Sequence, residues 1–290
     1  MYKLGRHLEN VGIAAPGTGS AVPKAKVPII KFCDKRTGIK IDISFENDTG
    51  LVANKTFRQW KDQYPDMPII VVLIKQLLAM RGLNEVFTGG LGGFSIICLV
   101  VSMLQHLSEA ESAAIDPEQR HAVLLLRFLN IYGNEFDVKR TGIVMNPGTT
   151  FNKITHPRKK QNANTLTIID PNNAANDISG GSREIMRVLG VFRTAYFQLN
   201  LRIQQLDSGK GVSDSILGCM WGGDYMSFIH QRDKLSKLHP GHRVSPPPGM
   251  STKRAPQNGG FKTLPPKPAT GLPERPNKKG YVDLYFDTIA

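Results

Sequence analysis

Apolar and polar side chains alternate strictly from Ile39 to Glu46. Successive side chains of a strand point to opposite faces of a sheet, so this alternation predicts a strand with one face in a core. The apolar face carries Ile39, Ile41, Ile43 and Phe45, and the polar face carries Lys40, Asp42, Ser44 and Glu46. The residues from Val27 to Phe32 predict a second strand, joined to the first by the turn formers at 34–38. A two-stranded hairpin leaves its apolar face open, so we expect the helices that follow to cover it.

The pattern changes to helical spacing at about Gly50. Apolar residues recur three and four positions apart over residues 54–64, 68–81, 95–107, 117–132, 183–205 and 224–238, which predicts six helices. Residues 14–26 are interpreted as a loop, and residues 133–170 as loops and short strands around Gly142, Ile143 and Val144. We therefore predict an α+β fold in three parts: a partial sheet at 1–49, a mainly helical domain at 50–236, and a tail at 237–290.

The net charge of +13 favours an anionic partner, with nucleic acid or phosphate ahead of a membrane surface. Residues 237–280 hold nine Lys and Arg and one acid, so they contribute +8 of the +13. This segment is rich in Pro and Gly and lacks apolar periodicity, which predicts a disordered basic tail. Such a tail binds RNA through phosphate contacts, or serves as a solubilising segment or a nuclear-import signal.

The three cysteines are far apart and fit neither a disulfide framework nor a metal site, which favours a reducing compartment. The longest apolar run, residues 94–104, is too short to span a bilayer. The first ten residues contain no apolar signal core. We therefore expect an intracellular, soluble protein with no membrane partner.

A loop rich in Asn and Gly, residues 170–182, follows a short apolar segment at 166–169. Its side-chain amides at Asn172, Asn173 and Asn176 carry both donors and acceptors, which suits the edge of a nucleobase. The same residue types are ordinary turn formers, so a plain surface loop is the alternative.

Two further features suit a phosphate. The run Gly89-Gly90-Leu91-Gly92-Gly93 leads into the predicted helix at Phe94, and a helix N-terminus offers free N–H groups and a partial positive charge. Lys75 lies on the preceding helix among apolar residues. The alternative for the glycine run is a loop that only allows close packing, and the alternative for Lys75 is a surface lysine whose ammonium reaches solvent. Phe94 is a candidate for stacking on a base, with a core phenylalanine as the alternative.

Asp42 stands on the polar face of the alternating strand. A carboxylate there is a candidate metal ligand, because two-metal phosphoryl transfer needs several carboxylates around the ions. The alternative is a solvated acid on a strand.

Four segments occur in this order along the chain: VPIIKFCDKRTGIKIDISFEN, IKQLLAMRGLNEVFTGGLGGFSIICLVVSMLQHL, YGNEFDVKRTGI and LTIIDPNNAANDISGGSREI. Together they resemble the Trf-type nuclear poly(A) polymerases of fungi, the catalytic subunits of TRAMP RNA-surveillance complexes, within the DNA polymerase β-like nucleotidyltransferases. The resemblance covers residues 1–236. It implies that residues 1–49 are the C-terminal remnant of the catalytic palm and that residues 50–236 are the helical central domain.

The resemblance also implies the roles of single residues. Asp42 would be the catalytic carboxylate that binds Mg²⁺ or Mn²⁺, Asn54 would lie near the ribose, and Lys75 would contact the triphosphate. Asp170, Asn173 and Asn176 would form the nucleotide-recognition loop, where uridine-adding relatives carry a histidine at the position of Asn176.

Two departures from the family pattern stand out. Many members have Ser-Ser-Tyr where this chain has Gly92-Gly93-Phe94, so backbone amides at Gly93 would replace a hydroxyl contact and Phe94 would replace the stacking tyrosine. The family's Gly-Ser motif and its paired Asp-x-Asp ligands have no counterpart in residues 1–38. We therefore expect a truncated form with little or no activity of its own, because one carboxylate does not hold two metal ions.

The function implied is the addition of AMP from ATP to RNA 3′ ends in nuclear RNA surveillance. The expected partners are RNA 3′ ends, ATP, a zinc-knuckle RNA-binding protein and an RNA helicase, and the expected location is the nucleus or nucleolus. The alternatives are a non-catalytic short form that binds RNA and partner proteins, and terminal uridylyl transfer.

Overall fold

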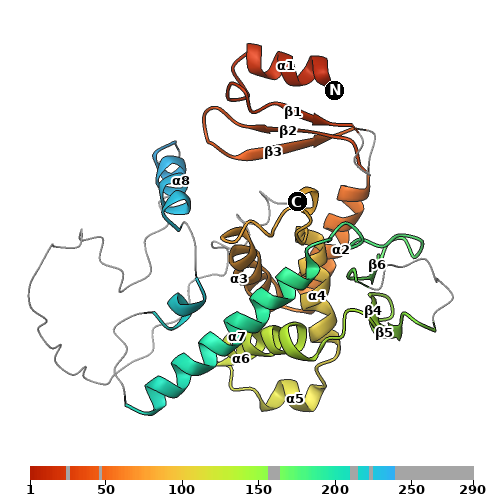
Figure 1. Cartoon of the computed structure of the whole chain (residues 1–290), viewed down its shortest axis with the longest axis vertical. Coiled ribbons are helices and arrows are strands. Elements are labelled where there is room, and N and C mark those ends of the chain that lie inside the picture. The colour runs from red at the N-terminus through yellow and green to blue at the C-terminus, as the bar shows by residue number, and fades with distance from the viewer. Residues whose placement is uncertain (24–26, 46–47, 156–163, 210–214, 222–224, 239–290) are drawn as a thin grey trace, which may run out of the picture. The chain divides into compact units, whose positions relative to one another are not determined.

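A computed structural model describes residues 1–23, 27–45, 48–155, 164–209, 215–221 and 225–238 of the protein. The chain divides into two compact units, Met1–Gln231 and Arg232–Ala290. Of the tail predicted at 237–290, residues 239–290 lie outside the described residues, and the domain boundaries predicted at residues 49 and 236 stay predictions. The mixed helix and strand content confirms the predicted fold class (Figure 1).

The predicted helices and strands occur in the predicted order with shifts of a few residues at their ends, and α1, β1 and α5 occur in addition. Helices and single turns are α1 Tyr2–Asn10, α2 Thr49–Gln63, α3 Met67–Ala79, η1 Val86–Thr88, α4 Gly93–Gln105, α5 Glu109–Ala114, α6 Arg120–Asn130, η2 Ile131–Glu135, α7 Ile185–Asp207, η3 Ile216–Met220 and α8 Tyr225–Leu238. Strands are β1 Ser20–Val22, β2 Ile29–Cys33, β3 Lys40–Ser44, β4 Thr141–Val144, β5 Thr149–Asn152 and β6 Ile168–Ile169.

The first sheet has three antiparallel strands in the order β1-β2-β3. The register of β2 and β3 pairs Ile30 with Ile43 and Phe32 with Ile41, which gathers the apolar side chains on one face as predicted. The polar face pairs Lys31 with Asp42. The hairpin turn is also confirmed, because the Asp34 carboxylate accepts the backbone N–H of Thr37 at 2.7 Å.

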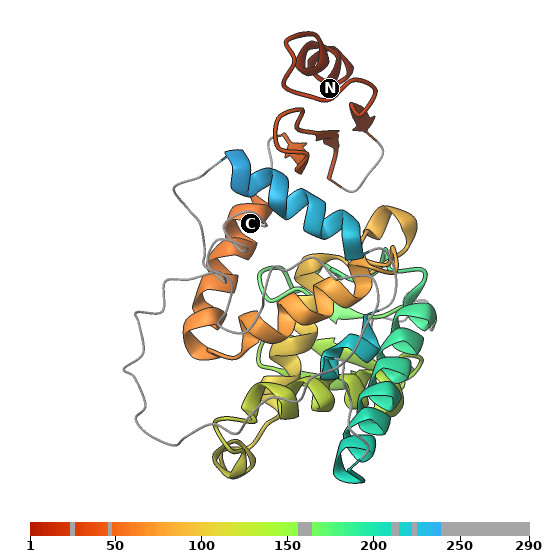
Figure 2. The ribbon, with the colours of Figure 1, turned by 90° about the vertical axis from the view of Figure 1, so that its left-hand side faces the viewer.

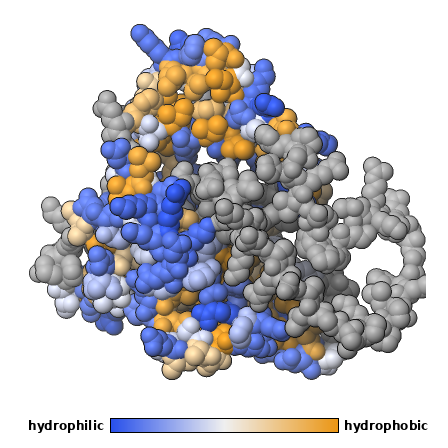
Figure 3. Space-filling model, turned by 180° about the vertical axis from the view of Figure 1, so that it is seen from behind, coloured by the Kyte–Doolittle hydropathy of each residue, from blue (hydrophilic) through white to orange (hydrophobic). Residues whose placement is uncertain are grey.

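Helix α1 covers the apolar face of this sheet (Figures 1 and 2). Its Leu4 and Leu8, together with Met1, pack against the core of Ala14, Ile30 and Phe32. Our expectation of a two-stranded hairpin covered by the later helices was therefore wrong. Residues 14–26, interpreted as a loop, supply the third strand, and the N-terminal helix supplies the cover. Apolar residues still gather on the surface at the top of Figure 3. In the segment after α1, Val11 is 52% exposed and Ile13 47%.

Helix α4 is the most buried helix of the central region, because every residue from Ser95 to Leu104 is buried. A helix that is apolar on all sides must be surrounded by other elements. The Tyr132 hydroxyl donates to the Leu99 carbonyl at 2.7 Å, and Phe128 packs edge-on against Phe192 at 5.3 Å. These contacts join α4 to η2 and α6 to α7.

One glycine lets η2 approach α7 closely. A Cβ added at Gly133 would lie 2.6 Å from the Arg193 backbone nitrogen, which is inside any real contact distance. The Arg193 side chain confirms the contact, since its Nε donates to the Gly133 carbonyl at 2.8 Å.

The second sheet has the order β5-β4-β6, with an antiparallel and a parallel pair. Its strands bear out the predictions for Gly142–Val144 and for residues 166–169. Nearby, the Lys153 ammonium donates to the carbonyls of Val138 at 2.9 Å and Thr165 at 2.6 Å. The three cysteines are free. In the part of the chain that is described, the helices all fall short of the length and apolar character needed to cross a membrane.

Candidate functional site

The N-terminus of α4 is formed by two glycines, which have no side chains. Gly92 is its N-cap and Gly93 its first residue, and among the described residues this helix start has no side-chain cap hydrogen bond. A Cβ added at Gly93 would lie 3.3 Å from the Lys75 Nζ, so the ammonium group on α3 sits beside the first turn of α4. Two positive elements, the helix end and the ammonium, therefore meet at one place.

Burial lowers the pKa of Lys75 to about 8. Burial is the sole cause, so no described carboxylate compensates the charge of Lys75. A half-buried ammonium without a counter-ion is poorly stabilised until an anion arrives. The arrangement is therefore suited to binding a phosphate or another anion.

The glycine run before α4 is also held by packing. A Cβ added at Gly90 would collide with the Leu83 carbonyl, and Gly89 has a φ of +92°. The Gly89 carbonyl accepts the backbone N–H of Glu184 at 2.8 Å, next to the start of α7. Backbone conformation and close packing thus explain why Gly89 and Gly90 are glycines. At Gly93 the missing side chain leaves the space beside the Lys75 ammonium open.

Phe94 stacks on Trp60 of α2, with ring centroids 6.3 Å apart and an angle of 18° between the rings. Trp60 is buried and Phe94 is half-buried. Asn54 lies on the same helix and is half-buried. The contact that joins α2 to the N-terminus of α4 is made by Trp60.

The loop from Asp170 to Asn176 is ordered by its own side chains. The Asp170 carboxylate accepts the backbone N–H of Asn172 and the side-chain amide of Asn176, both at 2.8 Å. The Asp170 N–H donates to the Asn176 carbonyl at 3.0 Å, and the Asn173 side chain accepts the N–H of Ala175 at 3.0 Å. The contacts from Asp170 to Asn172 and from Asn173 to Ala175 are Asx turns, so the turn-former interpretation holds for the backbone, while Asn173 stays exposed.

The loop reaches both α2 and α4. The Thr56 hydroxyl is 2.7 Å from the Asn172 Oδ1, and the Ser95 hydroxyl donates to the Ile178 carbonyl at 3.4 Å. Burial, with a smaller contribution from the charge of Asp170, raises the pKa of the Cys98 thiol on α4. Hydrogen bonds thus join Thr56 of α2 and Ser95 of α4 to the segment from Asn172 to Ile178.

Asp42 has a different set of neighbours. Its carboxylate lies 3.4 Å from the Lys31 Nζ, which also donates to Glu85 at 3.1 Å. Burial would lower the pKa of Lys31, but the hydrogen bond to Glu85 and the charge of Asp42 outweigh it and raise that pKa. Within the described ranges, no hydrogen bond or ion pair joins Asp42 to Lys75 or to the Asp170 loop.

The described residues do not by themselves fit a metal centre. Across those ranges, no group of three or more His, Cys, Asp and Glu side chains is placed to hold an ion. Asp42 alone does not fit a two-metal site, and we derive no metal-dependent step from the residues present.

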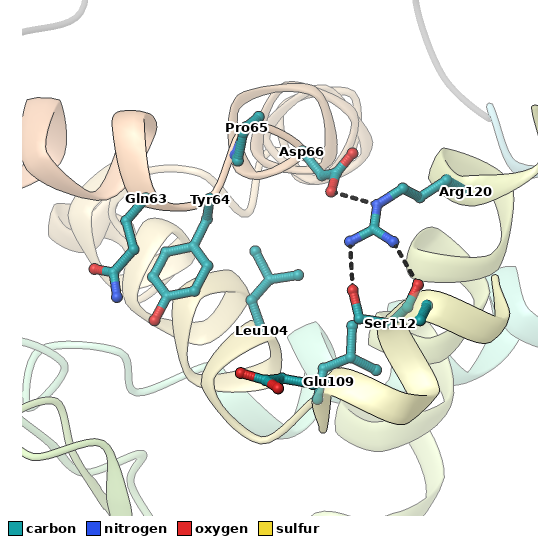
Figure 4. A pocket seen from close by; sticks show the side chains of 10 residues that line it. Gln63, Tyr64, Pro65, Asp66, Leu104, Glu109, Ser112 and Arg120 are labelled. Atoms are coloured by element: carbon teal, nitrogen blue, oxygen red, sulfur yellow. Dashed lines mark hydrogen bonds and ion pairs between the residues drawn. The ribbon is translucent and has the colours of Figure 1, made fainter. Parts of the chain in front are cut away.

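A separate pocket of about 550 Å³ lies at the other end of α4, where α3, α5 and α6 meet (Figure 4). There Arg120 donates to Asp66 at 2.7 Å and to the carbonyl and hydroxyl of Ser112, each at 3.0 Å (Figure 4). None of the residues predicted for the site lines this pocket.

Sequence reasoning missed Lys31, Thr56 and Trp60. Lys31 was readable once the hairpin register was set, because it faces Asp42 on the polar side of the sheet. Thr56 and Trp60 carried no such signal, since their partners Asn172 and Phe94 are far away in the sequence.

Two family models match separate stretches of the chain. A family described as "Poly(A) RNA polymerase, mitochondrial-like, central palm domain" matches residues 1–62, and one described as "Cid1 family poly A polymerase" matches residues 122–176. Poly(A) RNA polymerase protein 2 of Saccharomyces cerevisiae is 39% identical over 228 residues, which is 75% of this chain and 38% of that protein. Poly(A) RNA polymerase protein 1 of Eremothecium gossypii is 38% identical over 226 residues, 75% of this chain and 36% of that protein.

The solved polymerase core of TRAMP, an RNA surveillance complex, is 38% identical and superimposes with a TM-score of 0.66. The match covers 76% of this chain and 69% of that one. The chain spans less than two-fifths of the length of the two curated relatives.

Proposed function

We propose, since this chain belongs to the family of Trf-type poly(A) RNA polymerases, that its activity is the addition of AMP from ATP to RNA 3′ ends. In the proposed reaction the RNA 3′-hydroxyl attacks the α-phosphate of ATP and pyrophosphate leaves. From the same family membership we propose that the protein acts in nuclear RNA surveillance, with a zinc-knuckle RNA-binding protein and an RNA helicase as partners. No described residue favours uridylyl transfer over this reaction. Asp42, as the single predicted metal carboxylate, still predicts little activity of this chain by itself, and a short form that only binds RNA and partner proteins stays the alternative.

The observation that carries the proposal is the anion site at α4. Lys75 has its pKa lowered to about 8 and lies beside the uncapped N–H groups at Gly93. An ATP triphosphate would supply the negative charge that this place lacks. Phosphate binding at Lys75 and Gly93 is therefore the first role in the proposal.

The other roles follow from the neighbourhood of that site. Asn54 would contact the ribose and Phe94 would stack on the base, with its ring supported by Trp60. Asp170, Asn173 and Asn176 would recognise adenine, because an amide presents both a donor and an acceptor to the base edge. Asp42 would bind Mg²⁺ or Mn²⁺ together with carboxylates that the described residues do not supply.

ATP binding to Lys75→Met tests the proposal. The purified chain is titrated with ATP by calorimetry, and we expect the substitution to weaken ATP binding roughly tenfold or more, because a charge-assisted contact to phosphate is lost. Lys75→Arg should retain part of the affinity, since the charge stays but its geometry changes.

Lys55→Met is the matched control, because Lys55 is an exposed lysine on α2. It should leave ATP binding unchanged. Equal ATP affinity in the wild type and in Lys75→Met would contradict the proposed phosphate site.

A further inference from the structure

The Thr56 side chain joins α2 to the Asp170–Asn176 loop across 116 positions of sequence. Thr56 is only 9% exposed. Its Oγ1 lies 2.7 Å from the Asn172 Oδ1 and 3.2 Å from the Val52 carbonyl one turn earlier in α2. A hydroxyl has one hydrogen to donate, and the shorter contact runs to the loop.

From Asn172 the contacts continue to the tip of the loop. The Asn172 N–H donates to one oxygen of Asp170, and the other oxygen accepts the Asn176 side-chain amide, both at 2.8 Å. Thr56, Asn172, Asp170 and Asn176 thus form an unbroken series of hydrogen bonds. The series begins on a buried helix position and ends on the amide proposed to recognise adenine.

Asn172 itself is exposed, so water competes for its side chain. Its partner, the Thr56 hydroxyl, belongs to a helix and is held in place by α2. Without that partner, the loop keeps its internal turns but loses this bond to α2. The orientation of the Asn176 amide then has one restraint fewer.

We propose that Thr56 is a positioning residue that fixes the recognition loop on α2 and so supports the preference for ATP over UTP. Thr56 acts through Asn172 and Asp170, because its own side chain is buried. This inference rests on the proposed function, since it concerns the same nucleotide site.

Thr56→Val tests it, because valine keeps the shape of threonine and removes the hydroxyl. Hydrogen exchange of peptides spanning residues 170–177 should become several-fold faster, while peptides from α4 stay unchanged. Displacement of a fluorescent ATP analogue should show ATP affinity reduced roughly three- to tenfold, the range expected for one lost hydrogen bond. UTP affinity should change less, so the ratio of ATP to UTP affinity should fall.

Thr56→Ser separates positioning from packing. It restores the hydroxyl but not the methyl group, and it should recover the exchange rate and the affinity ratio. The matched control is Thr194→Val at an exposed position of α7, which should match the wild type in both measurements.

The outcomes distinguish this inference from the proposed function. Unchanged exchange at 170–177 in a folded Thr56→Val protein would overturn the inference. An unchanged ATP to UTP ratio would overturn it as well, provided that the wild type binds ATP. A wild type that binds no ATP would instead contradict the proposed function and with it any role of Thr56 in nucleotide choice.

Discussion

The position of Lys75 favours anion binding and lowers the free energy of unfolding of the nucleotide-free protein. Its ammonium is half-buried beside a helix N-terminus, where both burial and the helix dipole disfavour a positive charge. Lys75 was readable from the sequence as a lysine among apolar residues of a helix. Its place beside Gly93 was not, because the contact depends on how α3 packs on α4. Asn176 behaves in the same way: its amide chemistry was readable, but its hydrogen bond to Asp170 follows from the fold of the loop.

Replacing Lys75 should stabilise the nucleotide-free protein. The pKa is about 8 in the folded chain and 10.5 in the unfolded reference. Between these two values the unfolded state binds more protons, so stability rises with pH there, and the full destabilising effect is present below pH 8. We expect Lys75→Met to raise the free energy of unfolding at pH 7 by roughly 1–3 kcal/mol.

Urea unfolding at pH 7 and at pH 9.5 measures this effect. The advantage of Lys75→Met over the wild type should shrink at the higher pH, whereas Lys55→Met should match the wild type at both. A Lys75→Met protein less stable than the wild type at pH 7 would mean that the ammonium has a partner in the folded state.

At the scale of elements, the spacing of apolar residues predicted most helices and the β2–β3 hairpin. The buried face of a helix or strand needs apolar residues at its own period, and that period is visible in the sequence. The short helix α5 was missed, although Ser108 and Glu111 form a capping box at its start. Strand β1 was missed because three residues are too few to show alternation. Helix α1 was missed because it buries no residue completely and depends on the sheet beneath it.

Two glycines on neighbouring elements should respond in opposite ways to alanine. At Gly133 the new Cβ would lie 2.6 Å from the backbone of α7, so Gly133→Ala should lower the free energy of unfolding by roughly 2–4 kcal/mol. At Gly190, inside α7, a Cβ meets no atom within 4 Å. Gly190→Ala should therefore raise that free energy by about 0.5–1 kcal/mol.

Thermal unfolding followed by circular dichroism measures both changes, and each variant serves as the control for the other. A Gly133→Ala protein as stable as the wild type would contradict the close approach of η2 to α7.

At the scale of the molecule, the two ends of α4 lie at two different sites. Its N-terminus meets Lys75 and the Asp170 loop, and its C-terminal end meets the pocket in which Arg120 ties α3, α5 and α6 together. Thirteen residues of helix place these ends about 20 Å apart. The order of motifs along the chain predicted the family, but no sequence pattern predicted the Arg120 network, since Asp66, before α3, is 54 positions away in the sequence and Ser112 lies on another helix.

Arg120→Lys should therefore affect stability and leave nucleotide binding unchanged. Lysine cannot reproduce the bonds from three guanidinium nitrogens to Asp66 and Ser112, so we expect a loss of roughly 1–3 kcal/mol in the free energy of unfolding. Arg187→Lys is the matched control, because its exposed pair with Glu184 contributes little. Unfolding curves and ATP titrations of both variants check this, and weaker ATP binding in folded Arg120→Lys would show that the two ends of α4 are coupled.

The lowered pKa of Lys75 also makes this side chain unusual as a nucleophile. At pH 8 about half of its amine is neutral, whereas an ordinary lysine with a pKa near 10.4 is almost wholly protonated. A neutral amine attacks electrophiles and a protonated one does not. An amine-reactive electrophile would therefore acylate Lys75 ahead of the surface lysines in the nucleotide-free protein, and a bound triphosphate, which stabilises the ammonium form, would slow that reaction.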